Sequence, residues 1–244
     1  MGIKISINTF YYPGSNERFV NAHKEVMKHF NIPVNYYEKQ IHHAEFMEEV
    51  IRTSDADVVG FLDIDCIPLT STAVSELVKY VAKNKSIAGN VQATNHLYPM
   101  SHLFVAPSCF FIWKKLYDAI GKPTFYPTNQ TDVAQYVCHV AEQHGVRAKA
   151  LFPTHFEDEP EEGVWWLHNY GLYGIGTVFD GKFYHLFQSR FEKNVEMFIS
   201  RCKQVIDGKF STDGMFKSTD FDFQGKIACF QQEQTFKDRI KGKL

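Results

Sequence analysis

The run Val58-Val59-Gly60-Phe61-Leu62 is apolar throughout and leads directly into Asp63-Ile64-Asp65. A short apolar run without polar alternation is typical of a strand buried on both faces, as in a parallel sheet covered by helices. In open α/β sheets, ligands bind at the carboxyl ends of such strands. The run therefore predicts an α/β layer fold and places Asp63 and Asp65 at its binding edge.

The segments around this strand alternate between strand-like and helix-like patterns through the first two-thirds of the chain. Short β-branched or aromatic runs predict strands at residues 4–11, 33–37, 57–62, 86–92 and 147–152. Helical spacing of apolar residues predicts helices at residues 16–30 (with Asn16 as N-cap), 44–53, 72–84 and 131–144, and residues 109–120 suit a strand followed by a helix. This order predicts a Rossmann-like, mainly parallel sheet flanked by helices.

The last third of the chain follows a different pattern. Residues 153–176 are rich in loop signals, a hairpin is expected around residues 180–181, and residues 192–206 suit a helix. Without an internal repeat or a low-complexity linker, we expect one catalytic domain at residues 1–190. Residues 191–244 form a helical and loop extension packed on the same domain.

Composition narrows the function classes. The 26 basic and 28 acidic side chains give a formal net charge of -2, which gives no reason to expect tight non-specific binding to nucleic acid or anionic membranes. Five scattered cysteines without a CxxC pair argue against a zinc knuckle or a disulfide framework and suit a reducing compartment. We also expect no signal peptide and no membrane span, hence a cytoplasmic protein, in the host cytoplasm if the chain is viral.

The acidic pair predicts a metal site. On an extended backbone, positions i and i+2 point to one face, so the carboxylates of Asp63 and Asp65 lie close and repel each other. A hard divalent cation such as Mg2+ or Mn2+ removes that repulsion and can bridge to the pyrophosphate of a nucleotide. The alternative is a solvated turn in which one acid caps the next helix, but the apolar flank Cys66-Ile67-Pro68-Leu69 disfavours it.

Residues 55–69 resemble the Asp-x-Asp region of GT-A glycosyltransferases, especially the small family-2-like enzymes. Residues 5–11, 42–51 and 105–125 follow in that family's order, so the resemblance spans roughly residues 1–190. It implies the GT-A fold and metal-dependent transfer of a sugar from a nucleotide-diphosphate donor to an acceptor hydroxyl. Inversion is the expected stereochemistry, with retention left open.

The resemblance also implies roles for individual residues. The metal ligands would be Asp63, Asp65 and His185, with His155 and His168 as weaker histidine candidates. The donor would contact Thr9, Tyr11, Asp63 and Arg190, with Lys182 as another candidate for the diphosphate. Asp132, at the start of the predicted helix 131–144, would be the general base. Asp132 is otherwise an ordinary acid in a first helical turn, and His185 is otherwise a core histidine bonded to backbone.

An acidic run at residues 157–162 precedes Trp165 and Trp166. With Gly171, Gly174 and Gly176 following as hinges, this stretch is a candidate mobile lid that would close over a nucleotide sugar and exclude water. A solvated acidic loop anchored by buried tryptophans is an equally good interpretation.

The predicted donor is a nucleotide sugar, with a UDP-sugar preferred, and the predicted acceptor is a saccharide or a hydroxymethylated DNA base. A nucleotidyltransferase would share the α/β layers and the acidic metal site. Such an enzyme would need a glycine-rich phosphate-binding loop with a lysine or arginine near the N-terminus. Residues 9–15 contain one glycine and no lysine or arginine. A non-catalytic nucleotide-sugar-binding protein of similar fold is the third possibility.

Overall fold

Six strands form the central sheet of the computed structural model, which describes residues 2–94, 103–157, 164–167, 170–189 and 191–219. In spatial order they are β2 (Asn35–Glu38), β1 (Ile5–Tyr11), β3 (Val58–Leu62), β6 (Leu103–Trp113), β5 (Ile87–Ala93) and β7 (Lys149–Leu151). Only β6 is antiparallel to its neighbours, so the predicted mainly parallel sheet is confirmed.

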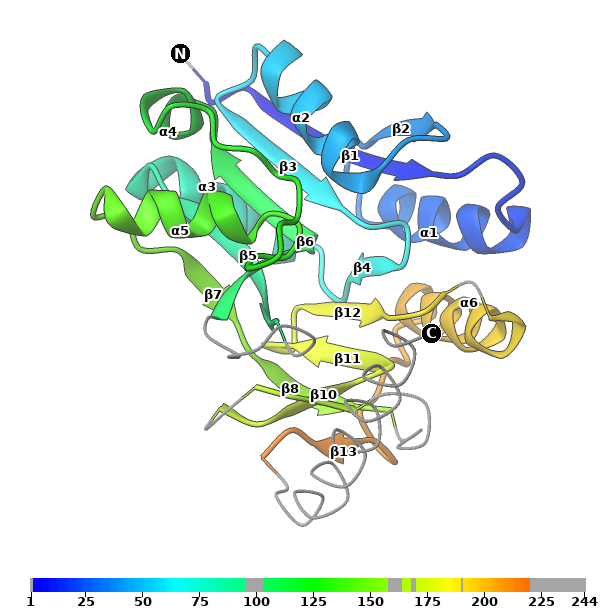
Figure 1. The fold of residues 1–244 in the computed structure, drawn as a ribbon. Coiled ribbons are helices and arrows are strands. Elements are labelled where there is room, and N and C mark those ends of the chain that lie inside the picture. Colours follow the sequence, from blue (N-terminus) through cyan, green and yellow to red (C-terminus); the bar gives the residue numbers. More distant parts are fainter. Residues whose placement is uncertain (1, 95–102, 158–163, 168–169, 190, 220–244) are drawn as a thin grey trace, which may run out of the picture.

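Helices flank this sheet, with α3 behind it and α5 in front of it in the view of Figure 1. The helices are α1 (Glu17–His29), α2 (His43–Thr53), α3 (Ala73–Asn84), α4 (Lys114–Ala119), α5 (Gln135–Gln143) and α6 (Glu192–Ile206). The predicted N-cap of α1 is confirmed, because the Asn16 side chain accepts hydrogen bonds from the N–H groups of Arg18 and Phe19.

The core of this layer forms on β3, which is buried at every position. Phe61 of β3 packs against Phe46 of α2, with ring centroids 6.0 Å apart, and against Phe125, at 6.2 Å. Phe125 in turn packs edge-on against Phe110 of β6, at 5.7 Å. This aromatic packing fixes the strand whose end carries the acidic pair, because each fully buried ring removes a large apolar area from water.

A second, antiparallel sheet lies beside the first. Its spatial order is β13 (Phe216–Lys217), β8 (Pro153–Phe156), β11 (Gly176–Phe179), β12 (Phe183–Leu186) and β4 (Cys66–Pro68). Strand β4 begins directly after Asp65, and its Cys66 is in register with His185 of β12. The two sheets therefore meet at the acidic pair, and their pairing brings His185 to it.

The expectation of a loop-rich stretch at residues 153–176 was wrong. Besides β8, it contains β9 (Val164–Trp166) and β10 (Leu172–Gly174), which pair with each other. Trp165 packs there against Tyr173 and Phe187, with ring centroids 5.6 and 5.1 Å away. Strands of three or four residues are too short to show a period of two, and so the pattern was missed. Residues 158–163 of the predicted lid lie outside the described residues.

The predicted helix at residues 131–144 begins later than expected. Helix α5 starts at Gln135, because the residues before it form a turn instead. The Asp132 side chain accepts a hydrogen bond from the N–H of Val133 at 2.7 Å, and Ala134 is left-handed at φ 67°. A short acidic side chain that bonds its own main chain competes with helix formation, which explains the shorter helix.

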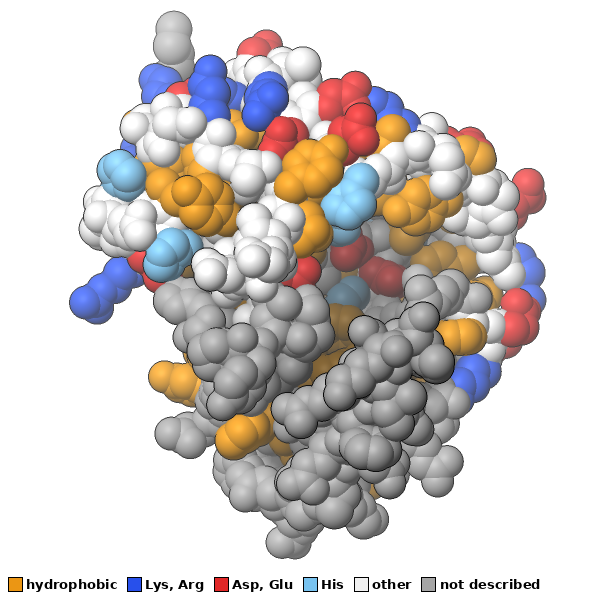
Figure 2. Space-filling model, viewed as in Figure 1, with side chains coloured by type: hydrophobic (Ala, Val, Ile, Leu, Met, Phe, Trp, Pro, Cys, Tyr) orange, Lys and Arg blue, Asp and Glu red, His pale blue; other side chains and the backbone are white. Residues whose placement is uncertain are grey.

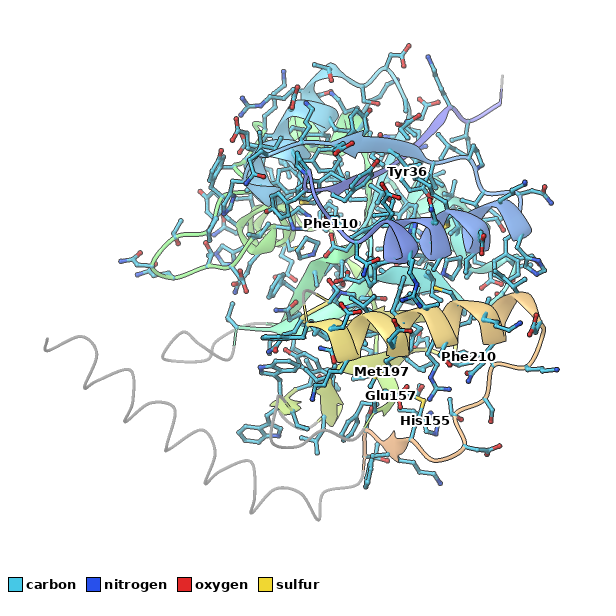
Figure 3. All side chains as sticks on the ribbon, turned by 90° about the vertical axis from the view of Figure 1, so that its right-hand side faces the viewer. Tyr36, Phe110, His155, Glu157, Met197 and Phe210 are labelled. Atoms are coloured by element: carbon cyan, nitrogen blue, oxygen red, sulfur yellow. The ribbon has the colours of Figure 1, made fainter. Side chains whose placement is uncertain are left out.

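Helix α6 packs alongside α1, as Figures 1 and 3 both show. Phe19 of α1 stacks on Phe198 of α6 at 4.4 Å, and Arg18 forms a two-pronged ion pair with Glu196. On the side of α6 away from α1, where Figure 3 labels Glu157, the Glu157 carboxylate binds the guanidinium of Arg201. Helix α6 is thus fixed from both sides. A domain boundary at residue 190 stays a prediction.

The four cysteines in the described part of the chain are buried and free of disulfides. Among the same residues, no helix has both the length and the apolar character needed to cross a membrane.

Candidate metal centre

Three side chains converge where the two sheets meet. Asp63 and Asp65 follow β3, and His185 reaches them from β12. One ligand atom of each lies within 4.8 Å of the others, and this trio is called the triad below. The main chain fixes both acids: the N–H of Asp63 donates to the carbonyl of Ser108, and the carbonyl of Asp65 accepts from the N–H of Leu186.

The triad suits a divalent cation. Ligands about 2.1 Å from one Mg2+ ion lie at most about 4 Å apart, so small side-chain movements would close the triad on an ion. Oδ1 of Asp65 and Nδ1 of His185 are buried, and neither has a well-aligned hydrogen-bond partner in the described part of the chain. Nε2 of His185 lies 3.2 Å from Oδ1 of Asp65, an ion-pair contact only. Two carboxylates favour Mg2+ or Mn2+, and an imidazole beside them is compatible with Mn2+.

Burial and charge act differently on the two acids. Burial raises the pKa of Asp63 above its usual value, although nearby His43 opposes this. Burial would also raise the pKa of Asp65, but the charge of His185 and side-chain contacts from His185 and Ser189 outweigh it, so the pKa lies below its usual value. Asp65 is therefore more readily ionised than Asp63. A bound cation would favour the charged form of both acids.

A cleft of about 520 Å³ opens onto the two acids. In Figure 2, acidic and histidine side chains lie at the base of a hollow near the middle of the face shown. The cleft is lined by the end of β1 and the turn after it, the start of α2, the acidic pair and the start of α6. Its volume lies in the range of about 300–1,000 Å³ that small-molecule sites occupy. No lysine or arginine of the described residues lines it.

Of the residues expected to bind the donor, some line the cleft and others do not. Tyr11 and Asp63 line the cleft. Thr9 is fully buried and does not line it, and its Oγ1 has no hydrogen-bond partner in the described part of the chain. Lys182 pairs with Glu76 on α3, and Arg190 lies outside the described residues.

The remaining predicted residues lie elsewhere. Asp132 is half-buried in the turn before α5 and is not part of the cleft lining. His155 is on β8 and does not belong to the triad. His168 lies outside the described residues.

Sequence reasoning missed His43 and Ser189. His43, the first residue of α2, lines the cleft and places Nε2 3.2 Å from Oδ1 of Asp63. Ser189 lines the cleft between β12 and α6 and contacts Asp65. A usable signal existed for His43: helices that follow parallel strands begin at the carboxyl edge of the sheet, where ligands bind.

A buried histidine supports the main chain behind the triad. His23 of α1 is fully buried, with Nε2 3.2 Å from the carbonyl oxygen of Cys66 and Nδ1 3.0 Å from the hydroxyl of Tyr36. This arrangement suits the neutral ring, with Nε2–H donating to Cys66 and the Tyr36 hydroxyl donating to Nδ1. Burial lowers the pKa of His23 to about 4, while contact with Cys66 and the charge of Asp65 oppose the shift.

We expect His23 to make stability depend on pH. Between about pH 6.5 and pH 4 the unfolded chain binds a proton at His23 that the folded chain does not, so the free energy of unfolding falls as pH is lowered through that window. The pKa difference corresponds to about 3 kcal/mol at the acid end. Urea unfolding at pH 7 and pH 4.5 measures it. His23→Gln should lose most of this dependence, and an equally steep fall in the variant would contradict the assignment.

No protein-family model and no curated protein matches the sequence. Solved structures of similar fold include a mannosyltransferase from Pyrobaculum calidifontis in complex with GDP-Man and Mn2+, at 10% identity, TM-score 0.45, and coverage of 61% of this chain and 54% of that chain. The present chain thus spans about half the length of that mannosyltransferase.

Two other solved structures have a similar fold. One is a glycosyltransferase involved in the glycosylation of the major capsid of PBCV-1, at 12% identity, TM-score 0.36, and coverage of 60% of this chain and 80% of that chain. Another is a CMP:2-keto-3-deoxy-manno-octonic acid synthetase complexed with CTP, at 10% identity, TM-score 0.35, and coverage of 60% and 88%.

Proposed function

We propose that this protein is a metal-dependent glycosyltransferase that moves a sugar from a nucleotide-diphosphate donor to an acceptor hydroxyl. The observation that carries the proposal is the triad of Asp63, Asp65 and His185 at the base of a nucleotide-sized cleft. Two acids that point together into a cleft are costly to keep charged unless a cation joins them. A site of this kind fits an anionic ligand that arrives with its metal.

The triad would hold Mn2+ or Mg2+, and that ion would neutralise the diphosphate of the donor as it leaves. Among the described residues that line the cleft there is no lysine or arginine, so within this part of the chain the ion would be the main positive charge. We therefore expect donor binding to depend strongly on the metal. The aromatic wall of Phe10, Tyr11 and Tyr12 gives the base of the nucleotide an apolar surface.

Acceptor activation is assigned to Asp132. In this proposal its carboxylate takes the proton of the acceptor hydroxyl, the hydroxyl oxygen bonds to the anomeric carbon, and the nucleoside diphosphate departs with the electrons of the broken bond. Asp132 lies in the turn before α5 and is not part of the cleft lining, so this assignment rests on its place in the chain order and not on a contact with the cleft. A saccharide acceptor remains our first choice and a hydroxymethylated DNA base the second, with a UDP-sugar as the preferred donor.

A thermal-shift screen tests the proposal directly. UDP, GDP, ADP, CDP and their common sugar conjugates are added with and without Mn2+. We expect at least one ligand to raise the melting temperature only when Mn2+ is present, because binding to the folded state stabilises it by mass action. If no nucleotide shifts the melting temperature with metal, the proposed function is wrong.

Product analysis separates the alternatives. A glycosyltransferase releases a nucleoside diphosphate from the nucleotide sugar that bound in the screen. A nucleotidyltransferase instead consumes a nucleoside triphosphate and a sugar phosphate and releases pyrophosphate. Metal-dependent binding with neither product would favour a non-catalytic nucleotide-sugar-binding protein.

A further inference from the structure

Each acid of the triad has its own histidine. Nε2 of His43 lies 3.2 Å from Oδ1 of Asp63, and Nε2 of His185 lies 3.2 Å from Oδ1 of Asp65. The two histidines differ in setting. The side chain of His185 is 5% exposed and belongs to the triad, whereas that of His43 is 23% exposed, lines the cleft and stands outside the triad.

His43 is held in place by its surroundings. It is the first residue of α2, and the preceding His42 caps that helix by accepting the N–H of Ala44 at Nδ1. Its ring lies against Phe10, with centroids 5.1 Å apart, and Phe10 stacks on Phe46 of the same helix at 4.7 Å. The imidazole is thus fixed between an aromatic ring and Asp63, so its nitrogen beside the carboxylate is a defined contact.

The contact leaves much of Asp63 available. A carboxylate offers about four acceptor positions on two oxygens, and His43 approaches only Oδ1. Asp63 remains partly exposed in the cleft. A phosphate would be repelled by this anion, whereas hydroxyl groups would donate to it. The vicinal hydroxyls of a ribose are the part of a nucleotide with that chemistry.

We propose that His43 is a positioning residue for donor selectivity: it holds the Asp63 carboxylate toward the ribose, so that ribonucleotides bind better than 2′-deoxyribonucleotides. This inference rests on the proposed function, because it concerns the same donor. Asp65 and His185 then hold the metal, while Asp63 is shared between metal and ribose. His43 acts only through Asp63 and the wall formed with Phe10.

Three substitutions separate the parts of this role. His43→Phe keeps a ring against Phe10 and removes the nitrogen beside Asp63. His43→Gln keeps a nitrogen donor of similar reach and removes the ring. His42→Asn is the matched control, since asparagine caps helices well and His42 has no contact with Asp63 among the described residues. His43→Leu serves as a second ring-free, donor-free variant should His43→Phe not fold.

The measurement is calorimetric binding of UDP, GDP, ADP and CDP, each against its 2′-deoxy counterpart, to the full chain at saturating Mn2+. We expect wild type and His42→Asn to favour the ribonucleotide by about tenfold, the value of one hydrogen bond to a charged group. His43→Phe should reduce the ratio of ribonucleotide to deoxyribonucleotide affinity to near one. His43→Gln should keep a ratio of about threefold or more, which is half of the wild-type preference on a logarithmic scale. Mn2+ affinity without nucleotide, measured by electron paramagnetic resonance, should change by less than about threefold in the His43 variants.

Several results would overturn the inference. A ribo-to-deoxyribo ratio unchanged in His43→Phe and in His43→Leu would remove His43 from selectivity. A loss of the ratio matched by an equal loss of Mn2+ affinity would show that His43 acts on the metal instead. Absence of any Mn2+-dependent nucleotide binding by the wild type is a different result, since it would overturn the proposed function and the inference together.

Discussion

Asp65→Asn is expected to weaken Mn2+ binding by at least about a hundredfold and to abolish the metal-dependent thermal shift with nucleotides. The substitution keeps the shape of the side chain but removes the charge that His185 and Ser189 help to stabilise. Because the folded state favours the charged form of Asp65, the metal-free variant should also be somewhat less stable than wild type near neutral pH. Calorimetric titration with Mn2+ and melting curves measure the two effects.

Glu192→Gln is the matched control for this prediction. Glu192 lines the same cleft at the start of α6 but does not belong to the triad. Removing its charge should change Mn2+ affinity by less than about threefold. If Asp65→Asn and Glu192→Gln weakened Mn2+ binding equally, the cleft would attract cations by its general negative charge and the triad would not be a metal site.

Gly89→Ala is expected to destabilise the fold by about 3 kcal/mol or more, with failure to fold as the extreme. A Cβ atom at Gly89 would lie 1.7 Å from the carbonyl oxygen of Cys109, so backbone must move. Strand β6 would be displaced next to Ser108, whose carbonyl accepts the N–H of Asp63. We therefore expect Mn2+ affinity to fall in any molecules that do fold.

Gly121→Ala provides the comparison. Gly121 also has a positive φ, of 87°, but a Cβ atom at this position would have no atom of the described residues within 4 Å, so only backbone strain opposes the change. About 1 kcal/mol is expected there. Urea unfolding of both variants tests the difference. Equal costs would mean that the contact between Gly89 and Cys109 does not constrain the sheet.

The apolar pattern of the sequence alone was enough to predict the strand that leads into the acidic pair. Val58–Leu62 is apolar at every position, and this alone indicates a buried strand whose carboxyl end is a binding edge. The convergence of Asp63, Asp65 and His185 followed from the resemblance and is observed. Their metal role stays a prediction, as does the role of Asp132.

Other parts of the site depend on contacts between distant segments. His185 reaches Asp65 only because β12 pairs with β4, and strands this short carry little periodicity. His43 meets Asp63 because β2, β1 and β3 are parallel neighbours, so α2, which follows β2, begins at the same edge of the sheet where β3 ends. The start of α5 was misjudged because a side-chain hydrogen bond at Asp132 outweighed helical spacing.

The pairing of β4 with β12 has a consequence for how the protein reaches its active form. The triad is complete only after strands from distant parts of the chain have found each other, and such non-local pairing forms slowly because the intervening loop must close first. During refolding, the capacity to bind Mn2+ tightly should therefore appear with the slowest phase, after helical signal has recovered. The rate of Mn2+ binding would then report the rate of the last folding step.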